Sequence, residues 1–311
     1  MGNAALVAVG SGGLSGAAVL AALSGAPVGI LLVYLAPLPL LMVGLGLGAG
    51  AFGFAAAAGL SVALIFGGYA GAGLYGGMHV IPSWLIVQQA LRPRLTSADG
   101  WQPIGTVLAS LTLLVAFVVL ATAWSSRSDV GLEASIGAML SAAIDGTLTS
   151  MDENARHLLV RELAPLFLGF SAVSWLAMLV INAALAQSLL VARDWNLRPR
   201  PNWSDIRVPS WLEWVLVGSA ATALVAGGDL AFLARNIAVV LLTPYFFVGL
   251  ACAHVIARRT PMPVLALGCF YVVLLVVFVV VAGLVAMLGV IDQWIGVRHR
   301  LASATPPERK E

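Results

Sequence analysis

The chain has 311 residues, of which 60% are hydrophobic and only 10% are charged. An average soluble domain carries about a quarter charged residues, because it has to cover its surface with them. This composition therefore excludes a water-soluble enzyme and a disordered chain, and it indicates an integral membrane protein. The formal net charge of +2 is too small to indicate a nucleic-acid partner.

The first 91 residues form a Gly/Ala-rich block without a single Asp, Glu, Lys or Arg. A membrane-spanning helix needs about 20 apolar residues, so this block holds about four spans. Turn-forming residues place them near 4–24, 28–45, 51–67 and 68–89. The second of these is interrupted by Pro37 and Pro39.

The rest of the chain alternates between apolar and polar segments. A basic loop and a fifth span occupy 92–124, an acidic extracytoplasmic loop 125–162, a C-terminal transmembrane bundle 163–291, and a polar tail 292–311. The bundle contains apolar runs at 163–192, 211–228, 236–257 and 264–291. The sequence thus predicts an all-α, polytopic helix bundle with eight or nine spans.

Arginines in the short loops set the expected orientation, because basic loops stay in the cytoplasm. The arginine-rich loop 193–210 is then cytoplasmic, together with Arg92, Arg94, Arg258 and Arg259. Nine spans, however, place the basic tail on the outside, against this rule. Either one predicted span does not cross, with the short run 211–228 as the first suspect, or the tail is an exception.

The acidic loop 125–162 contains an amphipathic pattern. Apolar residues recur at helical spacing from Leu132 to Leu148 and predict a helix with one apolar face. This helix is either a lid on the outer membrane surface or a connector that covers the ends of the spans.

Small residues in the first block recur four apart, a spacing that lets helix backbones approach closely in a membrane. We expect such pairs to pack within the chain or against a partner. The candidate packing residues are Gly12, Gly16, Gly44, Gly48, Gly67, Gly71, Gly73 and Gly77.

Polar side chains at membrane depth are candidates for function, since burying them in an apolar phase is unfavourable. Five such residues are candidates for lining a ligand cavity: Tyr34, Tyr75, His79, Asn182 and Gln187. The alternative is that they form hydrogen bonds between helices.

The sequence offers no catalytic motif, metal-ligand spacing or cofactor site. The match of Gly48–Gly53 to GxGxxG lacks the acidic residue about 20 positions further on that a dinucleotide site needs. The only lysine is Lys310, so the chain has no phosphate-binding loop for ATP. We therefore expect no enzymatic activity, and any transport would draw its energy from other subunits.

Several stretches resemble one bacterial membrane-protein family. They are YLAPLPLLMVGLGLGAGAFGFAAA at 34–57, AMLVINAALAQSLLVARDWNLRPRP at 177–201, GGDLAFLARNIAVVLLTPYFFVGLACAH at 227–254 and IDQWIGVRHR at 291–300. The chain resembles YybS-like membrane proteins (domain of unknown function 2232) over nearly its whole length. That family is similar to the substrate-binding S components of energy-coupling-factor transporters. The resemblance implies a multi-pass protein of the bacterial inner membrane that works with a separate transmembrane subunit and ATPases.

Two functions follow from these observations. The first is an S-component-like protein that captures a small metabolite in the membrane. The second is a non-catalytic scaffold in envelope or division assembly, which would use its glycine faces and amphipathic loop for partner contacts.

Overall fold

The computed structural model describes residues 2–23, 27–95, 97, 100–125 and 130–303. Within these ranges the regular secondary structure is helical, apart from one isolated bridge between Pro93 and Trp101, so the all-α prediction is confirmed. The α-helices are α1 (Gly2–Leu23), α2 (Pro27–Leu35), α3 (Pro37–Leu47), α4 (Ala49–Tyr75), α5 (Ile81–Ala90), α6 (Ile104–Ser125), α7 (Leu132–Thr147), α8 (Glu153–Leu163), α9 (Phe167–Val191), α10 (Trp211–Val225), α11 (Gly228–Ala257), α12 (Pro263–Val276), α13 (Phe278–Ile295) and α14 (Val297–Ser303). Short π- or 3-10 segments are η1 (Gly76–Val80), η2 (Ala164–Leu166) and η3 (Trp203–Asp205).

Among the described residues, seven helical segments are long and apolar enough to cross a membrane, which supports a multi-pass helical membrane protein. They are Asn3–Ala21, Val28–Leu47, Ala49–Ala90, Ile104–Ser125, Glu153–Val191, Gly228–Ala257 and Phe278–Ile295. Two shorter apolar helices, α10 and α12, lie between them in the chain.

The chain divides into two compact units. Unit 1 comprises Met1–Leu114 and Ser174–Pro201, and unit 2 comprises Val115–Val173 and Asn202–Glu311. Each unit therefore combines segments far apart in sequence, and the continuous helices α6 and α9 contribute to both.

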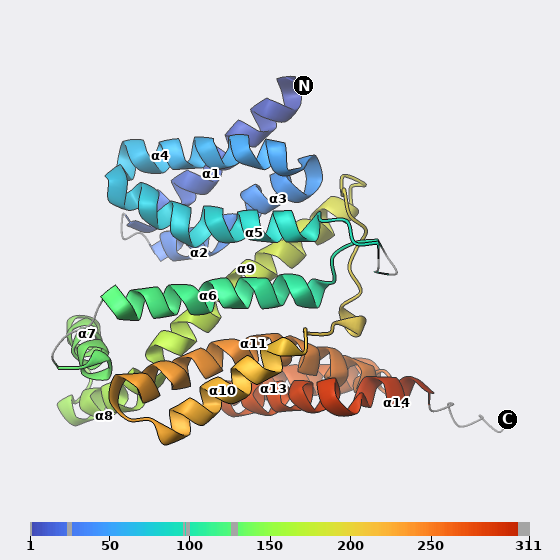
Figure 1. The fold of residues 1–311 in the computed structure, drawn as a ribbon. Coiled ribbons are helices and arrows are strands. Elements are labelled where there is room, and N and C mark those ends of the chain that lie inside the picture. Colours follow the sequence, from blue (N-terminus) through green and yellow to red (C-terminus); the bar gives the residue numbers. More distant parts are fainter. Residues whose placement is uncertain (1, 24–26, 96, 98–99, 126–129, 304–311) are drawn as a thin grey trace. The chain divides into compact units, whose positions relative to one another are not determined.

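In unit 1, α4 is a helical hairpin and not one straight rod. Gly68 has φ +64° and ψ −166°, a conformation that breaks the helix. Sixteen residues along a straight helix span about 24 Å, yet a Cβ atom on Gly59 would overlap with the Tyr75 hydroxyl. A Cβ atom on Gly71 would lie 3.2 Å from the Ala63 carbonyl oxygen. The chain therefore reverses at Gly68, as Figure 1 shows for α4, and the segment Ala49–Ala90 contains two antiparallel apolar helices.

Glycine permits the close approach of α1 to the first half of α4. A Cβ atom on Gly12 would overlap with the Ala55 carbonyl, and one on Gly16 would lie 2.7 Å from the Gly59 carbonyl oxygen. The residue numbers of the paired positions increase together, from Gly12 with Ala55 to Gly16 with Gly59, so α1 and this half of α4 run parallel. The Ser15 side chain donates a 2.5 Å hydrogen bond to the Ala36 carbonyl.

The other candidate packing glycines differ among themselves. Gly44 lies against Val87, and Gly67 lies against Leu20 at the hairpin turn. Gly48 has φ +92° and ends α3, so its role is conformational. Nothing described lies within 4 Å of a Cβ placed on Gly73 or Gly77. Gly73 and Gly77 therefore make no close backbone contact with the described residues, and their packing against a partner stays a prediction.

In unit 2, the apolar run predicted as one span over 264–291 is two helices. Val277, with φ −117° and ψ 48°, separates α12 from α13. A Cβ atom on Gly289 would overlap with the Tyr245 carbonyl, and Arg259 donates a hydrogen bond to the Leu301 carbonyl. The later residue of α11 and its following turn, Arg259, thus contacts the later residue of the C-terminal segment, Leu301, so α13 runs parallel to α11. Helix α12, which lies between them in sequence, returns the chain toward the level where α11 begins.

This reversal places the C-terminal segment of unit 2 with the basic loops. Arg298 donates hydrogen bonds to the carbonyls of Ser204 (2.6 Å) and Ile206 (2.8 Å), while Arg259 contacts Leu301. Three basic segments, around residues 204–208, 258–259 and 298–301, therefore lie at one end of the unit.

The predicted amphipathic helix is α7, and it packs on α11 through its apolar face. Leu132 is buried in a cluster with Ala123 and Phe232. The Leu132 N–H donates a 2.8 Å hydrogen bond to Asp229 Oδ1, so a carboxylate from α11 satisfies the first turn of α7. Arg235 forms a 3.2 Å ion pair with Glu133. These contacts favour the connector interpretation over the lid.

Candidate functional site

A buried polar network runs through unit 1 from α1 to η1. The Tyr75 hydroxyl donates to Ser15 Oγ at 2.9 Å, and Ser15 in turn donates to the Ala36 carbonyl. The His79 ring lies with its centroid 5.8 Å from that of Tyr75. Tyr75 and His79 are 0% and 2% exposed, so both lie within the packed interior of the unit.

Helix α9 approaches the same network from the other side. Asn182 Nδ2 donates to the Tyr34 carbonyl at 2.8 Å, and the Tyr34 hydroxyl lies 2.8 Å from Ser174 Oγ. Next to Ser174, Trp175 Nε1 donates to the Met78 carbonyl of η1 at 3.0 Å. Four of the five predicted cavity residues, Tyr34, Tyr75, His79 and Asn182, thus lie together in this part of unit 1.

Breaks in two helices create this site. Pro37 and Pro39 interrupt the helix between α2 and α3, and on either side of this break the carbonyls of Tyr34 and Ala36 accept hydrogen bonds from Asn182 and Ser15. In the π-helical segment η1, which follows α4, the Met78 carbonyl accepts a hydrogen bond from Trp175. Irregular backbone at membrane depth occurs where protein groups satisfy it, and π-segments often occur at functional sites.

Three buried polar atoms of this region have no hydrogen-bond partner among the described residues. They are His79 Nδ1, Ser83 Oγ and Asn182 Oδ1. The Asn182 amide cannot simply be turned over, because its nitrogen donates to two carbonyls, those of Tyr34 and Met178. A buried polar group without a partner costs about 1–3 kcal/mol, so each of these atoms is a candidate for binding a solute or water.

Asn236 in unit 2 provides an internal comparison. Its Nδ2 also donates to the carbonyl four residues earlier, at Phe232, and to one from another segment, at Pro165. Its Oδ1, however, accepts a 2.7 Å hydrogen bond from the Gly169 N–H. The two buried asparagines make the same donor contacts, and only Asn182 keeps an acceptor that no described protein group satisfies.

The fifth predicted residue, Gln187, lies apart from this network. Its Nε2 donates to the Arg198 carbonyl at 2.6 Å, and Arg198 Nη1 donates to the Ala90 carbonyl at 3.2 Å. The Leu197 N–H also donates to the Leu45 carbonyl. Gln187 thus bonds to the segment after α9, and that segment contacts the ends of α3 and α5 through Leu197 and Arg198. These contacts support the fold.

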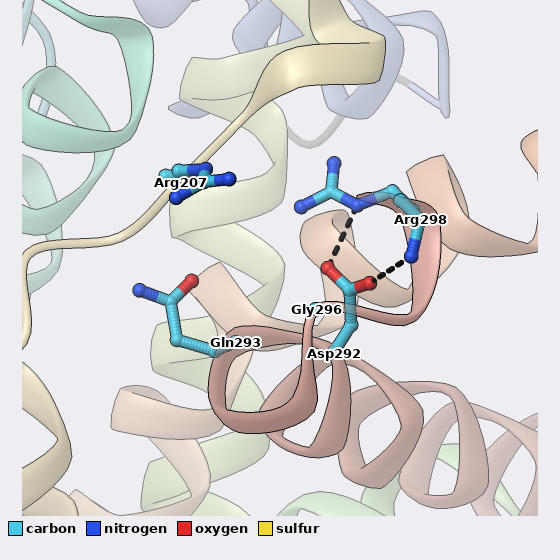
Figure 2. A pocket seen from close by; sticks show the side chains of 5 residues that line it. All are labelled: Arg207, Asp292, Gln293, Gly296 and Arg298. Atoms are coloured by element: carbon cyan, nitrogen blue, oxygen red, sulfur yellow. Dashed lines mark hydrogen bonds and ion pairs between the residues drawn. The ribbon is translucent and has the colours of Figure 1, made fainter. Parts of the chain in front are cut away.

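A second polar site, which sequence reasoning missed, lies at the basic end of unit 2. Asp292, 4% exposed, accepts hydrogen bonds from the Arg298 backbone N–H (2.8 Å) and from its Nε (2.7 Å). These residues line a pocket of about 50 Å³ together with Arg207, Gln293 and Gly296 (Figure 2). The available signal was an Asp and an Arg on either side of Gly296, which ends α13 in the left-handed conformation and turns the chain back.

The other hollow that the structure describes in unit 2 is open and apolar. It has a volume of about 830 Å³ and is lined by one face of α12, from Met262 to Val273. An open apolar face of this kind is typical of a surface that lipid chains cover, and neither hollow includes a predicted cavity residue.

The helices, their apolar surfaces and the buried polar groups define a multi-pass helical membrane protein. The chain belongs to the family of predicted membrane proteins DUF2232, whose family model matches residues 15–293. No curated protein and no solved structure matches the chain. The resemblance to this family inferred from the sequence is thus confirmed, while the similarity to YybS and to S components remains a prediction.

Proposed function

We propose that this protein captures a small polar solute within unit 1, in the manner of an S component, and does no chemistry of its own. The observation that carries this proposal is the unpaired acceptor Asn182 Oδ1, held in place by two hydrogen bonds from the same amide. A solute N–H or O–H would satisfy it. The discontinuous helix α2–α3 supports the proposal, since broken helices form solute sites in several transporter folds.

The charge of unit 1 restricts the class of solute. Residues 2–90, 104–114 and 174–191, which form its helices, contain no Asp, Glu, Lys or Arg. An ion buried among them would lack a counter-charge, which is strongly unfavourable in an apolar environment. We therefore expect an uncharged solute with several hydrogen-bond donors, including one for Asn182 and a partner for His79 Nδ1.

The proposed setting is the bacterial inner membrane, with a separate transmembrane subunit and ATPases as partners. The chain has no phosphate-binding loop, so its own residues cannot couple ATP hydrolysis to uptake. Solute capture alone requires only a binding site that opens to one side and a partner that supplies energy.

The test is affinity purification of the tagged full chain from native membranes in mild detergent, followed by analysis of co-purifying proteins and metabolites. The variants are Asn182→Ala and, as the matched control, Asn236→Ala. Both remove a buried amide that contacts an i−4 carbonyl and a second segment, so both lose similar structural hydrogen bonds.

We expect the unmodified chain and Asn236→Ala to retain the same metabolite and an ATPase-containing complex. Asn182→Ala should retain the partners and lose the metabolite by at least tenfold. Recovery of envelope or division proteins without any metabolite would instead support the scaffold function. Equal metabolite retention by Asn182→Ala would contradict the proposed site.

A further inference from the structure

The small pocket at the basic end of unit 2 places two arginines around a single carboxylate. Arg207 lies on the chain between η3 and α10, and Arg298 lies in α14; both line the pocket (Figure 2). Asp292 is committed to Arg298 through both of its oxygens. With two arginines and one carboxylate, the residues that line the pocket carry a formal charge of +1, which favours an anion between the two guanidinium groups.

The surrounding residues strengthen this field. The described residues at this end contain five arginines, at 207, 258, 259, 298 and 300, against the carboxylates of Asp205, Glu213 and Asp292. Both oxygens of Asp292 accept hydrogen bonds from Arg298, and Glu213 accepts a 2.8 Å hydrogen bond from Trp294 Nε1. A cluster of basic residues beside membrane helices attracts phosphate groups of anionic lipids.

Tryptophan side chains indicate the depth of the pocket. Trp294 directly follows the pocket residue Gln293 and is 66% exposed, and Trp214 on α10 is 76% exposed. Exposed tryptophans at the ends of membrane helices lie at the level of the lipid headgroups. A volume of about 50 Å³ suits a single compact anionic group and excludes a larger metabolite.

We propose that this pocket binds a phosphate group between Arg207 and Arg298, with Gln293 as a further polar contact. A phospholipid headgroup and free inorganic phosphate share this chemistry. Arg298 already supports the chain by bonding to Asp292, Ser204 and Ile206, so it contributes a fixed charge. Arg207 is exposed and contributes the second cation.

The experiment measures lipid adducts on the purified full chain by native mass spectrometry. The lipids are phosphatidylglycerol and, as the probe without phosphate, diacylglycerol, each titrated with and without millimolar inorganic phosphate. The test variant is Arg207→Gln. The control is Arg258→Gln, which removes the same charge from an exposed residue at the same end of unit 2 that does not line the pocket.

We expect Arg207→Gln to weaken phosphatidylglycerol binding about fivefold, the factor that corresponds to one basic contact near a membrane surface, and Arg258→Gln to leave it within twofold. Diacylglycerol should not bind in an Arg207-dependent way. Competition by inorganic phosphate would assign the site to a free anion, and lack of competition would assign it to a lipid headgroup. Equal effects of the two variants, or no effect of either at unchanged thermal stability, would overturn the proposal.

Discussion

Replacing Gly12 by alanine should weaken the contact between α1 and α4. The added Cβ would overlap with the carbonyl oxygen, carbonyl carbon and Cα of Ala55, all of them backbone atoms. Because no flexible side chain can move aside, the two helices must separate along the interface. Overpacking of this kind costs about 1–3 kcal/mol, whereas alanine gains about 1 kcal/mol over glycine in a helix. The difference between these two terms leaves a net loss of up to about 2 kcal/mol in the free energy of unfolding.

Gly13 is the matched control, because it lies next to Gly12 on α1 and a Cβ there meets nothing within 4 Å. Gly13→Ala should keep the gain in helix propensity without the clash, and so leave stability unchanged or raised. The assay is unfolding of the purified full chain from mild detergent by titration with SDS, followed by circular dichroism or tryptophan fluorescence. If both variants moved the midpoint by the same amount, the close packing of α1 on α4 would be refuted.

Three further results are expected. Asp292→Asn leaves the Arg298 guanidinium buried without its carboxylate and should cost about 3–5 kcal/mol in SDS unfolding; Glu213→Gln should cost less than about 1 kcal/mol, since its contact is exposed. Gly68→Ala should cost about 1–2 kcal/mol, because φ is +64° there, and Gly218→Ala in the regular helix α10 should not. In a cysteine-free background, cysteines at Thr260 and Leu301 should react with an impermeant maleimide from the same side of the membrane, and one at Val225 from the other; labelling of 260 and 301 from opposite sides would contradict the reversal at Val277.

The membrane class and most of the helices follow directly from the sequence. Because the first block has no charged residue before Arg92, the sequence predicts that it lies in the membrane. The pair Gly67–Gly68 marks the hairpin turn that the structure places at Gly68. These features are predictable because they depend on local composition and on backbone conformations that favour glycine.

The division of 264–291 was not predictable in the same way. The break at Val277 lies within a run of valines, VLLVVFVVVA at 273–282, with no glycine, proline or polar residue to mark it. What decides it is packing: the contacts of Gly289 with the Tyr245 carbonyl and of Arg259 with the Leu301 carbonyl are made together when α13 runs parallel to α11. Such long-range contacts carry no local signal, and the sequence alone therefore predicted one span here.

The candidate site shows the same limit. Residue type identified four members of the unit 1 network, because polar groups are rare at membrane depth. It could not distinguish Asn182 from Gln187, since only the fold shows that Gln187 bonds to the Arg198 carbonyl and that Asn182 keeps an unpaired oxygen. The Asp292–Arg298 pair was missed because its function depends on the turn at Gly296 and on carbonyls of the distant residues Ser204 and Ile206.

The most direct test of solute capture is a cryo-electron microscopy structure of the full chain, purified from native membranes into lipid nanodiscs with an antibody fragment to aid alignment. We predict non-protein density within hydrogen-bonding distance of Asn182 Oδ1, in the unmodified chain and in Asn236→Ala. This density should be lost in Asn182→Ala, while the hydrogen bond between Tyr75 and Ser15 remains. If Asn182 Oδ1 instead accepts a hydrogen bond from a protein group and no such density is present, the proposed capture site is contradicted.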